Sequence, residues 1–346
     1  MGKTLVTGAS GFIGGQLVRE LIARGDEVVC LARRVAAAEQ LRAIGAHIVE
    51  GNVTAPESLV AAVADAQTVY HLAGAVRARN AAEFFQINAT GVANLLDTCR
   101  KRSTPPTVVL VSSLAAAGPS SADRPRIEED PPRPVSNYGR SKRAGELEAI
   151  ARAGEIPITI IRPPVVLGDG DAVGLALFRI ISGSGMHLVP GLARSKLSIV
   201  HVSDLVPVLI ATAARGTRLP PAAETTVGRH AAKQVDPRGY YFVAGDQDPT
   251  YGELGRLIGQ ALGRRRTCVI RFPRPAVWSI AACTELIARA RGRAPFAGID
   301  KAREALAGHW TCSSARAKAD LGFVPEKSLP KLLRQTAEWY RRHGWL

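Results

Sequence analysis

A tyrosine and a lysine four residues apart, Tyr138 and Lys142, form the first pair in the sequence whose side chains could do chemistry together. Residues with this spacing share one face of a helix. A tyrosine normally loses its proton near pH 10, and a neighbouring ammonium group favours the phenolate, which lowers the pKa of the phenol. The pair therefore predicts a side chain that can donate or accept a proton near neutral pH.

Ser113 is the candidate partner of this pair. It is the second residue of Ser112-Ser113, which follows a predicted strand over Thr107–Val111, and its hydroxyl could hydrogen-bond the same substrate oxygen as Tyr138. Taken alone, the spacing of Tyr138 and Lys142 also occurs by chance on solvated surface helices. We favour the functional interpretation because the serine pair and a glycine-rich turn precede it in one alternating pattern of strands and helices.

The chain begins with a strand, a glycine-rich turn and a helix within Lys3–Gly25, with Gly8, Gly11 and Gly14 spaced G-x-x-G-x-x-G. Gly8 can adopt the backbone angles of a tight turn, Gly11 lets a pyrophosphate approach the main chain, and Gly14 lets the helix pack close to the strand. The helix N-terminus offers free N–H groups and a positive dipole end to phosphates. An ordinary strand–helix turn is the alternative, but the flanking strand and helix favour dinucleotide binding.

The end of the second predicted strand, Glu27–Leu31, bears on which dinucleotide is expected. In dinucleotide folds an acidic residue at this place binds the 2′-hydroxyl of the adenosine ribose, whereas an arginine nearby accommodates a 2′-phosphate. This chain has Ala32 at the acidic position, followed by Arg33 and Arg34. Arg33 can pair with the phosphate and stack on the adenine, although two surface arginines in a loop are the alternative. We therefore expect NADPH to be preferred over NADH.

Strands and helices alternate along the first half of the chain, which predicts an α/β fold: a Rossmann-type, doubly wound parallel sheet with right-handed crossovers. We expect a dinucleotide-binding domain over residues 1–168, to which 196–215 and 240–246 return, and a smaller, mainly helical C-terminal substrate lobe over 169–195, 216–239 and 247–346. Further strands are expected at His47–Glu50, Thr68–Leu72, Thr107–Val111, Ile158–Ile161 and Tyr240–Gly245, and helices at residues 36–44, 56–63, 175–182, 205–214 and 251–262.

Three segments of the substrate lobe have no simple periodic pattern. Residues 183–197 contain glycines and a proline and predict a mobile loop. Residues 215–239 are polar and aperiodic and predict an excursion or a partly disordered loop. Residues 275–290 form an apolar stretch that ends in basic residues, which we interpret as a lobe helix packed on the core. A wall of an apolar substrate pocket, or a surface that docks on anionic lipid, is the alternative for this helix.

The motifs TGASGFIG, HLAG, INATG, VSSLAAAG and YGRSK resemble the extended short-chain dehydrogenase/reductase superfamily, the NAD-dependent epimerases and dehydratases, across essentially the whole chain. The resemblance implies that Ser113, Tyr138 and Lys142 are the catalytic triad, that Lys142 also holds the ribose hydroxyls, and that Asn88 supports a proton-relay water. Asn52 stands where the family usually has an adenine-binding aspartate, which should weaken that contact. The implied cofactor-binding residues are Gly8, Ser10, Gly11, Phe12, Ile13, Gly14, Arg33, Asn52, Val53, Leu72, Ala73, Gly74, Tyr138, Lys142, Pro163 and Val165.

Two positions after the sixth predicted strand bear on the substrate. Where nucleotide-sugar epimerases and dehydratases carry an asparagine and an arginine that hold a sugar-nucleotide diphosphate, this chain has Val165 and Leu197. Losing polar groups that would pair a diphosphate is costly for such a substrate. The RPPVVLG segment instead resembles the branch that contains dihydroflavonol reductases and 3β-hydroxysteroid dehydrogenases.

The resemblance therefore implies an NADPH-dependent ketoreductase or alcohol dehydrogenase that acts on a sterol-, flavonoid- or acyl-like substrate. Two alternatives are kept. One is a nucleotide-sugar epimerase or dehydratase with tightly bound NAD, and the other is a non-catalytic dinucleotide-binding scaffold. The resemblance also implies a homodimer formed through the helices that carry residues 88–96 and 138–150.

Composition limits the remaining functions. The five cysteines contain no C-x-x-C pair, which argues against a disulfide framework and a zinc site. The first strand begins at Lys3 and no apolar run is long enough to span a bilayer, so we expect a cytoplasmic protein. The net charge is +15, but the arginines are spread and aromatic residues make up 5%, which argues against nucleic-acid binding. A solvated basic surface is favoured; attraction to a phosphorylated cofactor, an acyl thioester or a membrane surface is the alternative.

Overall fold

The computed structural model describes residues 2–221 and 235–346, and its central element is a seven-stranded sheet with the order β10-β6-β5-β4-β1-β2-β3. All neighbouring strands are parallel. This confirms the predicted α/β fold class. The strands are β1 (Lys3–Thr7), β2 (Glu27–Ala32), β3 (His47–Glu50), β4 (Thr68–His71), β5 (Thr107–Val111), β6 (Ile158–Arg162) and β10 (Tyr240–Phe242).

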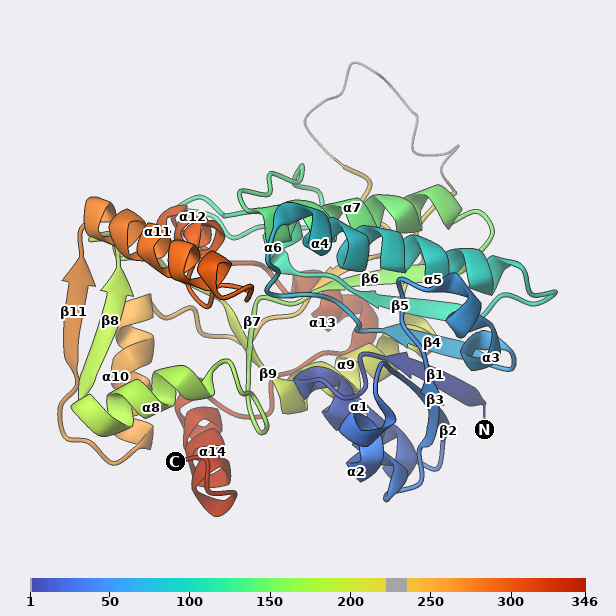
Figure 1. Ribbon diagram of the computed structural model, residues 1–346, viewed down its shortest axis with the longest axis horizontal. Helices are drawn as coiled ribbons and strands as arrows, with labels where there is room; N and C mark the ends of the chain where they lie inside the picture. The colour runs from blue at the N-terminus through green and yellow to red at the C-terminus, as the bar shows by residue number, and fades with distance from the viewer. Residues whose placement is uncertain (1, 222–234) are drawn as a thin grey trace.

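Helices cover both faces of this sheet (Figure 1). Because side chains alternate between the two faces of a strand, Val6 of β1 lies in the core beneath one layer of helices and Leu5 in the core beneath the other. Both cores are apolar, as is typical of a parallel sheet covered on both faces. One layer contains α1 (Phe12–Ala23), α2 (Glu39–Arg42), α9 (Val202–Arg215) and α13 (Ala315–Leu321), and the other contains α3 (Val60–Val63), α5 (Gly91–Arg100) and α7 (Asn137–Arg152).

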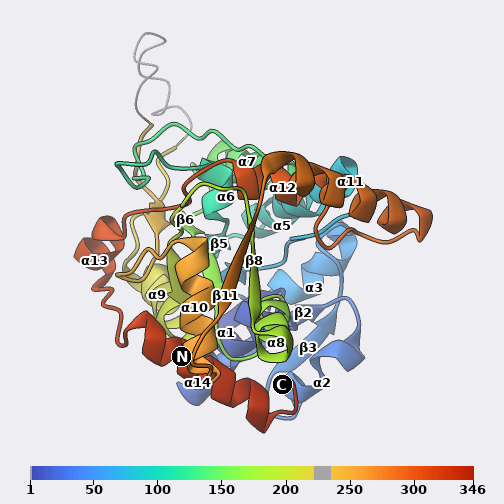
Figure 2. The same cartoon turned by 90° about the vertical axis from the view of Figure 1, so that its left-hand side faces the viewer.

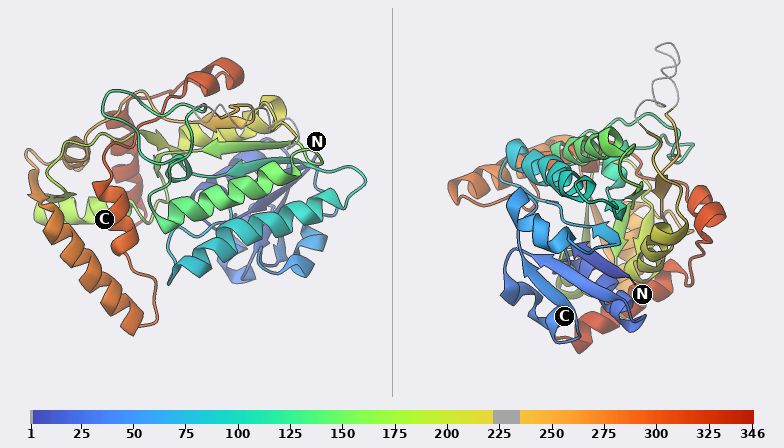
Figure 3. Two further views of the ribbon diagram at one scale, coloured as in Figure 1. Left: turned by 90° about the horizontal axis from the view of Figure 1, so that it is seen from above. Right: turned by 90° about the vertical axis from the view of Figure 1, so that its right-hand side faces the viewer.

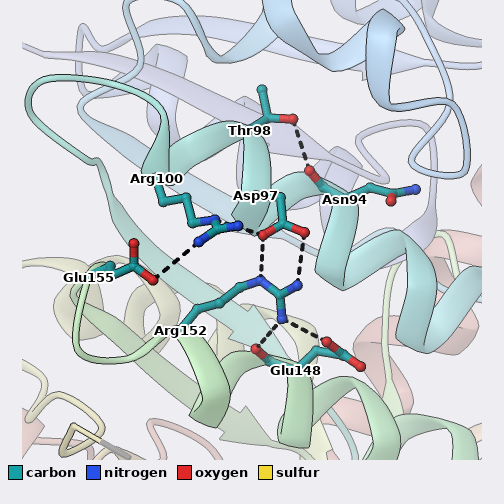
Figure 4. Close-up of polar contacts among 7 residues, drawn as sticks. All are labelled: Asn94, Asp97, Thr98, Arg100, Glu148, Arg152 and Glu155. Atoms are coloured by element: carbon teal, nitrogen blue, oxygen red, sulfur yellow. Dashed lines mark hydrogen bonds and ion pairs between the residues drawn. The ribbon is translucent and has the colours of Figure 1, made fainter.

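Helices α5 and α7 lie side by side and are joined by charged groups (Figure 4). The guanidinium group of Arg152 donates two hydrogen bonds to the carboxylate of Asp97, each 2.8 Å long. The same guanidinium donates to Glu148 at 2.6 Å, and Arg100 pairs with Asp97 at 2.9 Å. This network holds the C-terminal end of α7 against α5, and the other end of α7 carries Tyr138. Homodimerisation through these two helices remains a prediction.

A third hydrophobic cluster lies beyond the carboxyl edge of the sheet (Figures 1 and 2). Phe178 and Tyr340 are fully buried in it, with ring centroids 5.2 Å apart in an edge-to-face contact. The elements that build this lobe are α8 (Leu175–Ser184), β8 (Met186–Pro190), α10 (Tyr251–Ala261), β11 (Cys268–Phe272) and α14 (Leu329–Arg342). The division of the chain into two domains is consistent with a separate cluster but remains a prediction.

The loop predicted over residues 183–197 is wrong in part, because β8 occupies its middle and pairs in parallel with β11. Along β8, His187 and Val189 are buried while Met186 and Leu188 are exposed, which is the alternation of a half-buried strand. The glycines and the proline that suggested a loop stand at the ends of this strand. Strand β11, which pairs with it, was not predicted.

Other elements differ from the predictions in detail. The helix predicted over residues 36–44 is a 3-10 turn, η1 (Val35–Ala38), followed by the short α2. Of the excursion predicted over residues 215–239, residues 222–234 lie outside the described part, while Leu219 is buried and its N–H donates to the Ile158 carbonyl at 2.8 Å.

Among the described residues, no helix has both the length and the apolar character needed to cross a membrane. The remaining elements are η2 (Pro56–Leu59), α4 (Ala81–Phe85), η3 (Gln86–Thr90), α6 (Leu114–Ala117), β7 (Val165–Leu167), β9 (Ile199–His201), α11 (Arg274–Ala290) and α12 (Ile299–Leu306).

Candidate active site

The predicted site residues gather at one edge of the sheet because they follow the ends of parallel strands. In open α/β sheets, ligands bind outside the carboxyl ends of the strands. Six strands contribute to this edge in turn. The segments are Gly8 after β1, Arg33 after β2, Asn52 and Val53 after β3, Leu72 to Gly74 after β4, Ser113 after β5, and Pro163 with Val165 after β6.

The glycine turn has the geometry of an anion site. Gly8 has a φ of 72°, and a Cβ there would lie 2.6 Å from the backbone nitrogen of Ala73. A Cβ on Gly14 would overlap the Gly8 carbonyl oxygen, so glycine at position 14 lets α1 pack closely on the glycine turn, and glycine at position 8 lets that turn pack closely on the turn after β4. Gly11 begins α1 without a side chain that caps the first turn. The free N–H groups in the first turn of α1 therefore fit the pyrophosphate of a dinucleotide.

The expected adenosine end of this edge is basic and open. Ala32 is buried and Arg33, the next residue, is exposed beyond the end of β2. The Asn52 side-chain oxygen accepts a hydrogen bond from the Thr54 N–H at 3.2 Å, and the Val53 carbonyl accepts one from Asn94 at 2.9 Å. Asn52 and Val53 thus brace the loop after β3, and their contacts with a cofactor remain predictions.

The other predicted cofactor residues lie at the same edge, and their side chains differ in how far they are exposed to solvent. Ser10 is exposed in the glycine turn, whereas Phe12 and Ile13 are half-buried against the core beneath α1. The Pro163 carbonyl accepts a hydrogen bond from the Leu114 N–H at 2.9 Å, which joins the end of β6 to the start of α6. Val165 is exposed at the start of β7.

Ser113 and Tyr138 come from different elements and meet. Ser113 caps the N-terminus of α6, where its hydroxyl oxygen accepts the Ala115 N–H at 3.1 Å. Tyr138 lies in the first turn of α7, which Ser136 caps by accepting the Gly139 N–H at 2.9 Å. The Ser113 hydroxyl lies close enough to the Tyr138 phenol to lower the pKa of that phenol. The structure therefore brings together the two hydroxyls that the sequence analysis proposed as partners.

The protonation of Tyr138 differs from the prediction. Burial raises the pKa of the Tyr138 phenol above its usual value, and the lowering influences come from Lys301 and Ser113, not from Lys142. The ring of Phe84, 6.0 Å away between centroids, contributes to that burial. The prediction assumed that the Lys142 ammonium, four residues away, would lower the pKa of the phenol. In the structure the effect of burial is the largest and sets the direction of the shift. The phenol consequently keeps its proton at neutral pH.

The ammonium group of Lys142 is directed at the sheet. It donates to the Val111 carbonyl, at the end of β5, over 2.7 Å. Burial lowers the pKa of Lys142 to about 8, with the charge of Glu146 opposing the shift. A Cβ on Gly74 would lie 3.4 Å from Lys142 Nζ, so the ammonium borders the turn after β4. This position is compatible with the predicted contact between Lys142 and a cofactor ribose.

Asn88 lies in the π-helical turn η3 and is almost fully buried. Its side-chain oxygen accepts the Ala75 N–H at 2.7 Å, and its amide group donates to the Ala75 carbonyl and to the Ser141 hydroxyl, both at 2.9 Å. The carboxamide thus fixes the loop after β4 to α7. Its support of a proton-relay water remains a prediction.

A buried ion pair lies one helical turn beyond Lys142. The carboxylate of Glu146 accepts two hydrogen bonds from Arg162 of β6, at 2.8 and 2.7 Å. Ser112 donates to the same carboxylate at 2.6 Å and Arg143 at 3.0 Å. Because Ser112 precedes Ser113, this cluster joins the strand end that carries the serine to the helix that carries Tyr138.

Helix α12, from the C-terminal lobe, docks on the first turn of α7. The carboxylate of Asp300 accepts the N–H groups of Asn137 and Tyr138 at 2.6 and 3.0 Å. Lys301 Nζ lies 5.0 Å from the centroid of the Tyr138 ring and donates to Glu304 at 2.7 Å. The sequence analysis missed Asp300, Lys301 and Glu304, because they lie on a helix more than 160 residues further along the chain with an ordinary solvated pattern.

An apolar cavity of about 190 Å³ opens beside the same helix. Ala305, one helical turn after Lys301, and Leu306 form one wall, and Leu192 of the loop after β8 faces them. Arg274, the first residue of α11, lies at its rim. The cavity is thus lined mainly by apolar groups and lies about one helical turn along α12 from Lys301.

Comparisons with known proteins agree with this geometry. The chain is 31% identical over 347 residues to a protein named ceramide reductase from Caulobacter vibrioides, a match that covers 100% of this chain and 96% of that protein. It is 30% identical over 223 residues to a 4-hydroxy-2-methyl-3-oxo-4-farnesyl-3,4-dihydroquinoline-1-oxide ketoreductase from Stigmatella aurantiaca, covering 62% of this chain and 65% of that one.

A likeness of fold extends to solved structures. The UDP-glucose 4-epimerase of Thermotoga maritima, solved with UDP-glucose, superposes with a TM-score of 0.75 at 21% identity, over 99% of each chain. The model of the NAD dependent epimerase/dehydratase family matches residues 4–228. The chain therefore belongs to the NAD dependent epimerase/dehydratase family, and it is an NAD(P)-dependent enzyme of the extended short-chain dehydrogenase/reductase type.

Proposed function

We propose that this protein is an NADPH-dependent ketoreductase that acts on an apolar, lipid-like carbonyl substrate. The observation that carries the proposal is the meeting of Ser113, at the start of α6, and Tyr138, in the first turn of α7, at the carboxyl edge of the sheet. A bound nicotinamide dinucleotide supplies the hydride for such a reaction. Ser113 would orient the substrate oxygen, Tyr138 would give it a proton, and Lys142 would hold the cofactor ribose.

The protonation of Tyr138 supports the reductive direction. Reduction of a ketone requires a proton donor at the oxygen, whereas oxidation of the alcohol requires a base. Because burial raises the pKa of the Tyr138 phenol, the donor form prevails at neutral pH. The reductive rate should fall only as the pH rises through this raised pKa, and the oxidative rate should rise over the same range.

Three features support an apolar substrate. Two relatives are named for a ceramide and for a farnesylated ring ketone. Val165 and Leu197 occupy the positions where a diphosphate-binding enzyme would need polar groups. The cavity beside α12 is lined mainly by apolar residues, among them Leu192 and Leu306. An alkyl or isoprenoid chain fits such a surface better than a nucleotide does.

The proposal is tested by following NADPH and NADH consumption with ketones of increasing alkyl length. We expect long-chain ketones to be reduced with NADPH and not with NADH. Arg33→Ala should weaken NADPH binding by about tenfold or more, because a charge-assisted hydrogen bond to the 2′-phosphate is lost. NADH binding should be unchanged. Arg42→Ala, which removes another exposed arginine from α2, is the matched control.

Two results would contradict this proposal. A preference for NADH that is insensitive to Arg33→Ala would overturn the cofactor assignment. Interconversion of a UDP-sugar, with NAD retained by the protein through gel filtration, would favour the nucleotide-sugar epimerase instead.

Lys301 should tune the phenol through its charge. The Lys301 ammonium lowers the pKa of Tyr138, so Lys301→Met should raise that pKa further. The pH profiles of reduction and of alcohol oxidation should both move to higher pH, and oxidation at neutral pH should fall a few-fold. Lys301→Arg keeps the charge and should restore the profile. A pH profile that Lys301→Met leaves in place would show that Lys301 has only a structural role.

A further inference from the structure

Helix α11 stands out from the C-terminal lobe with one face uncovered (Figures 2 and 3). It packs on α12, and its buried residues Ala281 and Ala288 lie on that side, seven positions apart. The two ribbon views show the helix extending past the neighbouring elements at the edge of the molecule. Its opposite face therefore meets solvent along the whole length of the helix.

The uncovered face is apolar. Leu286 is 70% exposed and Ile287 51%, and Ile280, seven residues before Ile287 and so on the same side of the helix, is 51% exposed. Glu285 and Arg289 are the charged residues between Pro275 and Ala290, and they pair with each other at 2.6 Å. Glu285 also accepts the N–H of Ile299 at 2.9 Å, which places it on the side of α12. The outer face thus presents large aliphatic side chains without a charge of its own.

Arginines stand at both ends of this face. Arg274 begins the helix, and Arg291 and Arg293 follow its end, all three exposed. Across residues 2–221 and 235–346, none of these three guanidinium groups has a carboxylate partner. An amphipathic helix with an apolar face and free arginines is the pattern of a helix that lies in a lipid interface.

We propose that α11 docks on an anionic lipid bilayer. The face of Leu286 and Ile287 would enter the boundary between headgroups and acyl chains, and the terminal arginines would contact lipid phosphates. A second copy of the chain is a poorer occupant. Because arginines stand at both ends, pairing two α11 helices in either direction brings like charges together, whereas lipid phosphates neutralise them.

Docking through α11 would also place the apolar cavity at the membrane. Arg274 lies at the rim of that cavity, and α12, which holds the first turn of α7, follows α11 in the chain. A lipid-like substrate could then pass from the bilayer toward Tyr138 without crossing water. Only this consequence rests on the proposed function, since the docking itself requires no reaction.

The test is co-sedimentation of the full chain with vesicles of phosphatidylglycerol and phosphatidylcholine, compared with pure phosphatidylcholine vesicles. We expect binding to the anionic vesicles that weakens as salt is added. Leu286→Glu/Ile287→Glu should reduce binding at least tenfold. Arg291→Glu/Arg293→Glu should reduce it by about fivefold or more for each arginine lost.

A matched control replaces Val60 and Val324, which are 61% and 74% exposed, with glutamate and should bind like the wild type. Failure of the wild type to sediment, or equal sedimentation of the Leu286→Glu/Ile287→Glu variant, would overturn the proposal. The proposal would also be overturned if the wild type formed a dimer and the Leu286→Glu/Ile287→Glu variant did not. These readouts involve no turnover, so they are independent of the proposed reaction.

Discussion

Replacing Tyr138 with phenylalanine is expected to lower kcat for ketone reduction by roughly a thousandfold, the scale of a lost general acid. The phenol is the proton donor in the proposed reaction, and burial keeps it protonated at neutral pH. Phenylalanine preserves the ring that contacts Phe84 and Lys301, so the fold and the binding of NADPH should be retained. Single-turnover rates of NADPH consumption measure the effect on the chemical step.

Tyr251→Phe is the control for this change, because it removes a phenol hydroxyl in the first turn of α10, within the C-terminal lobe. Its kcat should equal that of the wild type. NADPH affinity, measured by fluorescence titration, should be the same in both variants. If Tyr138→Phe reduced the ketone at a near-normal rate, a group other than the phenol would be the proton donor and the proposed mechanism would be wrong.

The sheet could be predicted because its signals are local. Each of its strands is a short apolar run that ends in a turn, and the boundaries of β3 and β5 agree with the prediction to the residue. The positions of Gly8 and Ser113 follow from this, since the carboxyl ends of parallel strands meet at one edge. The pairing of β8 with β11 could not be predicted in this way, because the two strands are short and far apart in the sequence, and glycines and a proline at the ends of β8 suggest a loop.

The sequence predicts which residues form the site better than it predicts their contacts, their burial and their protonation. The sequence shows that Lys142 is four residues from Tyr138, but not that the ammonium is directed at the Val111 carbonyl or that the phenol is buried. Lys301 reaches the ring of Tyr138 only because the C-terminal lobe folds back on α7. Such contacts depend on tertiary packing, and a helix pattern that looks solvated does not reveal them.

Removing the cation of the buried pair behind the site should have the largest effect on stability. Arg162 and Glu146 are 2% and 0% exposed, and they share two hydrogen bonds of 2.8 and 2.7 Å. Arg162→Met leaves the carboxylate buried with only Ser112 and Arg143 as partners. We expect the free energy of unfolding to fall by about 3–5 kcal/mol, as for other buried pairs that lose one member. Urea unfolding curves measure the loss.

The pH dependence of this loss has a definite sign. Burial alone would raise the pKa of Glu146, but Arg162 outweighs it and holds the pKa below its usual value. A depressed carboxyl pKa contributes stability above the unfolded value, about 4, and this stability is lost as the pH falls through the folded value. Arg162→Met releases the pKa of Glu146 upward, so the deficit should be largest at neutral pH and should shrink in acid.

The double variant Glu146→Leu/Arg162→Met separates the two causes of instability. Because it removes both members of the fully buried pair and leaves only the partly exposed Arg143 without its carboxylate, it should recover most of the stability lost in Arg162→Met. A deficit of the single variant below about 1 kcal/mol, independent of pH, would show that water or Arg143 already compensates the carboxylate. Even a stable double variant should reduce the ketone slowly, because Ser112 would lose the carboxylate that fixes it, and Ser113 is the next residue.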